Sequence, residues 1–145
     1  MKLLIYTDGA SRGNPGKSAS GYCIYDSQYN LLKQDVFYNG IATNNEAEYK
    51  AIVAALKAAL EFGKDSEIVL SSDSKLAINQ LLGKFKIKSG ELKKLNNEAT
   101  RLLGMFKSYR LENPRRSNSY ISKVDKQLNL FLDEMEKKEN AQTKL

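Results

Sequence analysis

Short apolar runs separated by turn residues fill the N-terminal part of the chain, and this pattern predicts β-strands. The predicted strands cover residues 3–7, 19–25 and 31–38. The polar connection at residues 26–30 is typical of a hairpin, so the second and third strands should pair antiparallel. Three strands in sequence predict an antiparallel meander.

The pattern then changes to helical periodicity, interrupted by two more short strands. Thr43 and Glu46 match a capping box, in which both side chains accept hydrogen bonds from backbone N–H groups at a helix start. The predicted elements are a helix from this box to Gly63, a strand at 67–72, helices at 75–82 and 91–107, a strand at 109–112 and a helix at 123–137. Residues 138–145 are polar, and we expect them to form a frayed tail.

This order of elements predicts an α/β fold with a mixed five-stranded sheet flanked by helices. Helical crossovers join strands 1, 4 and 5, which should therefore run parallel. Ligands of such sheets gather beyond the carboxyl ends of the parallel strands. The length of 145 residues fits one domain, which we place at residues 1–137.

Composition excludes several kinds of chemistry. The chain has no histidine and one cysteine, Cys23, which excludes histidine-dependent nucleophilic sites, imidazole-ligated zinc and a thiolate cage. It has no apolar run of membrane-spanning length and no signal-peptide core, so we expect a cytoplasmic protein without a membrane partner. Acid–base or metal chemistry must then depend on carboxylates, lysines or tyrosines.

The positive charge is concentrated in the middle of the chain. The formal net charge is +6, and residues 83–126 alone hold 12 basic and 4 acidic side chains. Such a segment favours a polyanionic partner such as nucleic acid, although a solvated lysine-rich surface has the same composition.

Four carboxylates fall where this fold brings the ends of its elements together. Asp8 and Asp73 follow strands 1 and 4, while Glu48 and Asp125 lie near helix starts on faces shared with apolar residues. Taken singly, each has a structural explanation as a turn residue or as an acid near a helix N-terminus. Taken together, they would repel one another without a cation, and carboxylate oxygens are the ligands of Mg²⁺. The sequence therefore predicts metal-assisted hydrolysis of a phosphodiester.

The motifs around these carboxylates resemble those of type 1 ribonuclease H. They are Tyr6–Ser11 with Gly13–Gly16, Thr43–Glu48, Ser72–Ser74, and the set Arg115, Asn118 and Asp125. The resemblance covers about residues 2–135. It implies an endonuclease that hydrolyses the RNA strand of RNA/DNA hybrids with two Mg²⁺ or Mn²⁺ ions and leaves 5′-phosphate and 3′-hydroxyl ends. It also implies that Asp8 bridges both ions, that Asp125 completes one ion site, and that Glu48 and Asp73 complete the other.

The resemblance also implies substrate contacts. Asn14, Asn44 and Asn45 match positions that touch the minor groove of the hybrid, where the 2′-hydroxyl distinguishes RNA from DNA. Arg115 belongs to the closing motif. Lys84, Lys86 and Lys88 lie in a segment that replaces the longer basic protrusion of some members, and we expect them to contact phosphates. No obligatory protein partner is evident.

Two features depart from the family pattern. The loop before the last aspartate lacks the histidine of many bacterial members, and the stretch from Asn118 to Asp125 is longer than the commonest form. Asp133 is a weaker alternative as the fourth ligand. Two other functions stay open: a nuclease of the same fold that acts on DNA or branched junctions, and a catalytically silent nucleic-acid-binding module.

Overall fold

The chain folds around one mixed five-stranded sheet, as the sequence predicts. The computed structural model describes residues 1–143. The strand order is β3-β2-β1-β4-β5, with β1 antiparallel to β2, β2 antiparallel to β3, and β1, β4 and β5 parallel. The strands are β1 (Lys2–Gly13), β2 (Gly16–Asp26), β3 (Leu31–Ala42), β4 (Glu67–Ser72) and β5 (Ser108–Glu112). The helices are α1 (Asn44–Ala59) with the short 3-10 turn η1 (Leu60–Phe62), α2 (Lys75–Leu81), α3 (Gly90–Leu103) and α4 (Ser119–Thr143).

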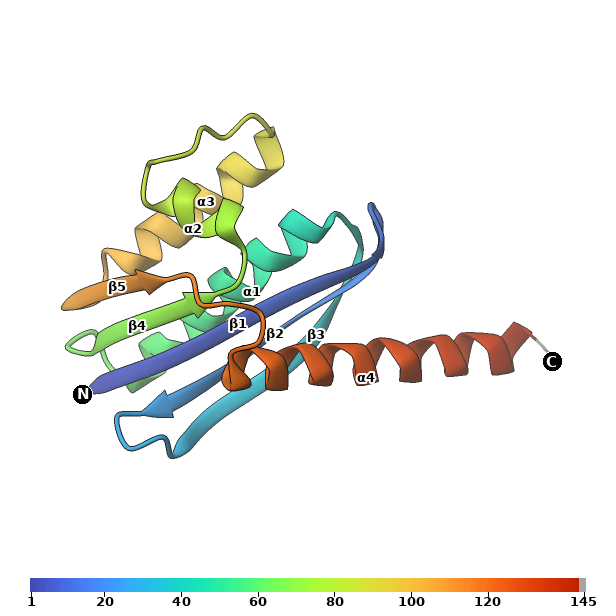
Figure 1. The fold of residues 1–145 in the computed structure, drawn as a ribbon, viewed down its shortest axis with the longest axis horizontal. Coiled ribbons are helices and arrows are strands. Elements are labelled where there is room, and N and C mark those ends of the chain that lie inside the picture. The colour runs from blue at the N-terminus through green and yellow to red at the C-terminus, as the bar shows by residue number, and fades with distance from the viewer. Residues whose placement is uncertain (144–145) are drawn as a thin grey trace.

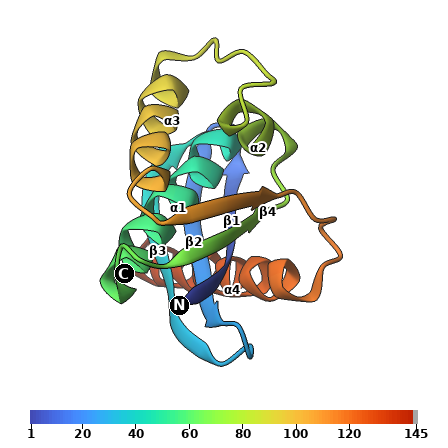
Figure 2. The ribbon, with the colours of Figure 1, turned by 90° about the vertical axis from the view of Figure 1, so that its left-hand side faces the viewer.

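Helices cover the two faces of the sheet unequally (Figures 1 and 2). On one face, α1 packs on β1 and β2, α2 contacts β4, and α3 packs on α1 and α2; this layer buries side chains such as Ile5, Ile52 and Leu70. On the other face, α4 packs along β1, β2 and β3 through Ile121 and Leu128. Helix α4 leaves this face of β4 and β5 open (Figure 1). In the part of the chain that the structure describes, no helix has the length and apolar character needed to cross a membrane.

The start of α1 lies directly against β1. The capping box is present as predicted, because the Thr43 hydroxyl accepts from the backbone N–H of Glu46 and the Glu46 carboxylate accepts from that of Thr43. A Cβ atom on Gly9 would lie 2.3 Å from the backbone carbonyl carbon of Ala47. Only glycine permits this approach, which brings the residue after Ala47, Glu48, next to β1.

Two boundaries differ from the prediction in ways that affect the site. Strand β1 continues to Gly13, so Asp8 lies inside it and not just beyond its end. Its parallel pairing with β4 nevertheless ends at Thr7 opposite Ser72, which leaves Asp8 and Asp73 immediately past the paired segment.

Helix α4 is longer than predicted at both ends. It begins at Ser119 because the Asn118 side chain accepts hydrogen bonds from the N–H groups of Tyr120 and Ile121. The expected frayed tail is helical as far as Thr143, while 144–145 lie outside the described residues. Ion pairs from the β1–β2 hairpin extend along these later turns, with Arg12 bound to Asp133 and Glu136, and Lys17 bound to Glu139.

Candidate metal centre

Three carboxylates from three elements converge at the carboxyl ends of the central parallel strands. Asp8 comes from β1, Glu48 from the first turns of α1, and Asp73 from the end of β4. Each offers an oxygen atom, and these oxygens all lie within 4.8 Å of one another. The backbone N–H of Gly9 donates to Asp8 Oδ1 at 3.0 Å and to Glu48 Oε1 at 3.2 Å. The strand and the helix therefore hold two of the carboxylates through one shared donor.

Burial makes this cluster electrostatically costly without a cation. Asp8 is 3% exposed and Glu48 is 4% exposed. Burial, followed by the charges of Asp73 and Asp125, raises the pKa of Asp8 to about 7, while its hydrogen bond with Glu48 opposes the rise. Burial and the neighbouring Asp8 raise the pKa of Glu48 well above its usual range. Both groups favour the neutral form until a positive charge arrives.

One oxygen of this cluster points to a missing partner. Glu48 Oε2 is buried and has no hydrogen-bond partner among the described residues. Buried carboxylate oxygens are normally satisfied, and an unsatisfied one in a native structure calls for an explanation such as an ion. An all-oxygen donor set of three acids fits a hard divalent cation such as Mg²⁺ or Mn²⁺.

The third carboxylate, Asp73, lies at the rim and already has a cationic partner. Arg116 donates from Nε to Asp73 Oδ2 at 3.2 Å, although the Arg116 side chain is 82% exposed. The sequence predicts the adjacent Arg115, whose side chain is exposed and forms no hydrogen bond or ion pair within residues 1–143. The two neighbouring arginines look equivalent in the sequence, and only the path of the β5–α4 connection distinguishes them.

Asp125 is close enough to Asp8 to affect its pKa. It lies in the second turn of α4, and both its charge and a hydrogen bond contribute to the raised pKa of Asp8. Asn129 donates from Nδ2 to the Asp125 backbone carbonyl at 3.0 Å and to Oδ1 at 3.4 Å. Asp125 does not belong to the cluster within 4.8 Å found among the described residues. The alternative ligand, Asp133, forms an ion pair with Arg12 at 2.7 Å and so connects α4 to the β1–β2 hairpin.

Two of the predicted asparagines join the β1–β2 hairpin to the start of α1. Asn14 Oδ1 accepts from the backbone N–H of Asn44 at 3.1 Å, and Asn44 Oδ1 accepts from that of Ser11 at 3.2 Å. These bonds occupy the carbonyl oxygens and leave the amide N–H groups available to a ligand. Asn45 is exposed in the first turn of α1.

The three predicted lysines lie in the irregular segment between α2 and α3, and Lys84, Lys86 and Lys88 are all exposed. The sequence does not predict the hydrogen bonds that attach this segment to the rest of the molecule. Gln80 donates from Nε2 to the Lys86 carbonyl at 3.1 Å and accepts from the Tyr49 hydroxyl at 2.7 Å. Tyr49 follows Glu48 in α1, so one buried chain of hydrogen bonds connects the helix of a site carboxylate to the basic segment.

Comparison with known proteins agrees with this architecture. The family model for RNase H matches residues 1–133, so the chain belongs to the RNase H family. Its arrangement of strands and helices, with β1, β4 and β5 parallel, is the RNase H-like fold, and the type 1 resemblance of the sequence is confirmed.

Three relatives show the range of the similarity. The bifunctional protein Rv2228c of Mycobacterium tuberculosis is 36% identical over 126 residues, which is 86% of this chain and 34% of that protein. Ribonuclease HI of Halobacterium salinarum is 38% identical over 118 residues, covering 81% of this chain and 59% of that protein. The structure of LC11-RNase H1 in complex with an RNA/DNA hybrid aligns with a TM-score of 0.78 and 31% identity, and it covers 90% of this chain and 99% of that one.

The fold of the Halobacterium salinarum RNase H1 crystal structure is also shared, with a TM-score of 0.82 at 36% identity. The chain spans about a third of the length of the mycobacterial relative and 59% of the curated Halobacterium protein.

Proposed function

We propose that this chain is an endonuclease that hydrolyses the RNA strand of RNA/DNA hybrids with divalent metal ions. The observation that carries the proposal is the convergence of Asp8, Glu48 and Asp73, with a buried Glu48 oxygen that lacks a protein partner. Membership of the RNase H family and the hybrid bound by LC11-RNase H1 support the choice of substrate.

The carboxylates would hold two Mg²⁺ or Mn²⁺ ions, with Asp8 shared between them. Such ions would activate a water and stabilise the leaving oxygen of a phosphodiester. As the family resemblance implies, the products would carry 5′-phosphate and 3′-hydroxyl ends. Glu48 and Asp73 would hold one ion and Asp125 the other. The clustering of Glu48 and Asp73 with Asp8, and the influence of Asp125 on the pKa of Asp8, support this assignment. The raised pKa values of Asp8 and Glu48 mean that their carboxylates become fully charged only when a cation compensates them.

Two surfaces beside the carboxylates would position the hybrid. The amide groups of Asn14, Asn44 and Asn45 would donate to the minor groove, where the 2′-hydroxyl marks the RNA strand. Lys84, Lys86 and Lys88 would contact phosphates without reading sequence, so binding should weaken as salt rises. Arg116, which contacts Asp73, is the arginine best placed to meet a scissile phosphate, with Arg115 beside it.

The test compares labelled substrates with the whole chain. A hybrid should be cut with Mg²⁺ or Mn²⁺ and remain intact in EDTA, and only its RNA strand should shorten. Asp65→Asn is a matched control for Asp8→Asn, because Asp65 is an exposed turn residue before β4, whereas the carboxylate cluster lies at the other end of that strand. Cleavage in EDTA would contradict the metal mechanism. A clear preference for a four-way junction or duplex DNA would favour a DNA nuclease, and hybrid binding without turnover in any metal would favour a silent binding module.

A further inference from the structure

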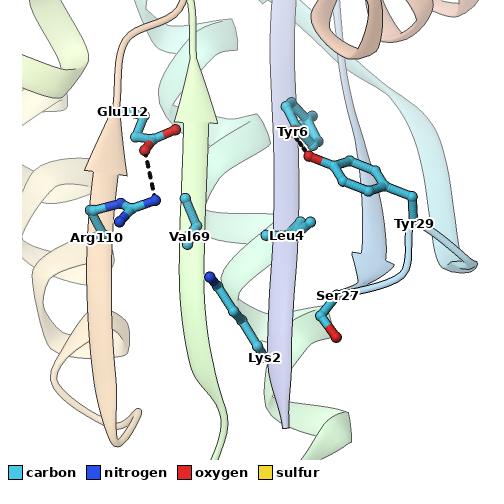
Figure 3. A pocket seen from close by; sticks show the side chains of 8 residues that line it. All are labelled: Lys2, Leu4, Tyr6, Ser27, Tyr29, Val69, Arg110 and Glu112. Carbon is cyan, nitrogen blue, oxygen red and sulfur yellow. Dashed lines mark hydrogen bonds and ion pairs between the residues drawn. The ribbon is translucent and has the colours of Figure 1, made fainter.

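A cavity of about 270 Å³ opens on the face of the sheet that α4 leaves uncovered. It lies between the first half of β1, the middle of β4 and the end of β5, with the β2–β3 turn at its side (Figure 3). Its lining residues are Lys2, Leu4, Tyr6, Ser27, Tyr29, Val69, Arg110 and Glu112. None of them belongs to the carboxylate cluster, the asparagines or the basic segment described above.

The cavity has an apolar floor and an aromatic wall. Leu4 and Val69 project from adjacent strands and form the floor (Figure 3). Tyr29 reaches from the β2–β3 turn toward Tyr6 on β1 (Figure 3), and the two hydroxyl groups share a hydrogen bond of 3.2 Å. A flat apolar ring would pack against both the apolar floor and the aromatic wall.

The aromatic wall is fixed in place by further rings. Tyr120, in the first turn of α4, stacks on Tyr6 with ring centres 4.9 Å apart and on Tyr29 with ring centres 4.8 Å apart. Tyr29 has a φ of +62°, a backbone conformation that residues other than glycine rarely adopt. These contacts hold an aromatic ring that is still 45% exposed beside the cavity.

The rim carries an excess of positive charge. Lys2 has no ion-pair partner within the described chain, and its amine points into the cavity (Figure 3). Arg110 binds Glu112 at 2.9 Å through one terminal nitrogen, which leaves its other N–H groups for a second acceptor. Two cations against one carboxylate favour an anionic ligand.

From this geometry we infer that the cavity binds a single nucleotide unit, with the base on Leu4 and Val69 against the tyrosine wall and the phosphate between Lys2 and Arg110. Aromatic rings interleaved with cations are the usual means of holding an unpaired nucleotide. A volume of about 270 Å³ is just below the range of most small-molecule pockets, which restricts the ligand to one base with its sugar and phosphate. The unit can come from a free mononucleotide or from the 5′-phosphorylated end of a single strand.

The test is calorimetric titration of the whole chain with adenosine 5′-monophosphate in EDTA, where no ion at the carboxylates can hold a phosphate. Saturable one-to-one binding is expected, with adenosine alone and inorganic phosphate alone each binding at least about tenfold more weakly. A parallel titration with a 5′-phosphorylated tetranucleotide separates the two sources. Equal affinities show that a strand end is accepted, and binding of the mononucleotide alone limits the site to free nucleotides.

Matched variants locate the site. Lys2→Gln and Tyr29→Asn should each weaken binding about tenfold, and asparagine tolerates the positive φ at position 29. Lys64→Gln and Tyr109→Asn are the controls, because Lys64 is exposed elsewhere and Tyr109, 49% exposed, pairs on β5 with Ile68 of the opposite face. Absence of binding, equal binding of phosphate alone, or equal losses in the control variants would each overturn the proposal.

The proposal does not depend on hybrid cleavage. Lys2→Gln should cut a hybrid at the rate of the unchanged chain while losing nucleotide affinity. Loss of cleavage in Asp8→Asn with retained nucleotide binding would show that the two sites are separate, whereas loss of nucleotide binding in Asp8→Asn would place the nucleotide at the carboxylates and contradict the cavity.

Discussion

The two halves of the candidate metal centre are built differently. Asp8 and Glu48 are almost fully buried, and the backbone N–H of Gly9 donates to both carboxylates. Asp73 and Asp125 lie at the rim, where Arg116 and Asn129 already bind them. The rim acids therefore have protein partners of their own, while the buried pair depends on an external cation. This difference separates the residues that create the metal site from those that complete it.

The largest effect should come from the buried pair. Asp8→Asn removes the carboxylate that both ions would share, and loss of several kcal/mol of metal stabilisation corresponds to about a thousandfold lower cleavage rate. The same change removes repulsion with Glu48 and Asp73, so the metal-free protein should unfold at a higher temperature. Single-turnover hybrid cleavage and thermal unfolding in EDTA measure the two effects. Asp8→Asn with normal cleavage would remove the buried pair from the mechanism.

Substitution of a rim carboxylate should lower the cleavage rate less than Asp8→Asn does. Asp125 and Asp133, both on α4, allow a direct comparison. Asp125→Asn leaves a neutral oxygen beside Asp8 and should lower the cleavage rate about a hundredfold, the upper range for weakening a metal site without destroying it. Asp133→Asn breaks only a pair with Arg12 at the surface and should leave cleavage unchanged, with a stability loss of at most about 1 kcal/mol. Equal rates for the two variants, or a larger loss in Asp133→Asn, would mean that Asp125 is not the fourth ligand.

The close approach of α1 to β1 is what buries Glu48, and Gly9→Ala should disturb it. The added Cβ would lie 2.3 Å from the Ala47 carbonyl carbon, so the helix must shift at a cost of about 1–3 kcal/mol. Urea unfolding measures the loss. Gly90→Ala is the control, since nothing lies within 4 Å of its Cβ and φ is ordinary. A Gly9→Ala protein as stable as the unchanged chain would show that the contact does not constrain Glu48.

A pH dependence of the metal-free stability between about pH 4 and 7 should come mainly from the buried pair. The pKa of Asp8 rises from 3.8 to about 7 on folding, so the folded chain binds more protons between these values and its metal-free stability should fall as pH rises through this window. Melting temperatures in EDTA should decline toward pH 7 and above, and Asp8→Asn should flatten the decline. Saturating Mg²⁺ should reverse the trend, because the ion binds the charged carboxylates. Stability that rises with pH in EDTA would contradict the assigned direction.

Local signals in the sequence predict much of this architecture. The capping box of α1 and the bounds of β4 depend on neighbouring residues, and both agree with the structure. The sequence prediction starts α4 too late, because the cap that begins the helix is the Asn118 side chain, which shows no periodicity. The bond from Arg116 to Asp73 joins residues 43 positions apart, which no local pattern contains. Gly9 looks like an ordinary turn glycine until the helix is placed against it.

The convergence of the three carboxylates was expected from strand order, but their unequal burial was not. Burial depends on how closely α1 approaches β1 and on the side of the sheet that α4 covers. These are properties of the packed molecule, and they decide which acids keep an unpaired oxygen.

The most direct test of the account is a titration of the metal-free chain with Mn²⁺, followed by calorimetry, for the unchanged protein and for Glu48→Gln. Glutamine keeps the shape of the side chain and its bond from Gly9 but removes the charge of the buried oxygen. The account predicts saturable binding in the unchanged chain and at least about tenfold weaker binding in Glu48→Gln, with the Asp133→Asn control unaffected. Unchanged Mn²⁺ affinity in Glu48→Gln would contradict a metal centre built on the buried pair.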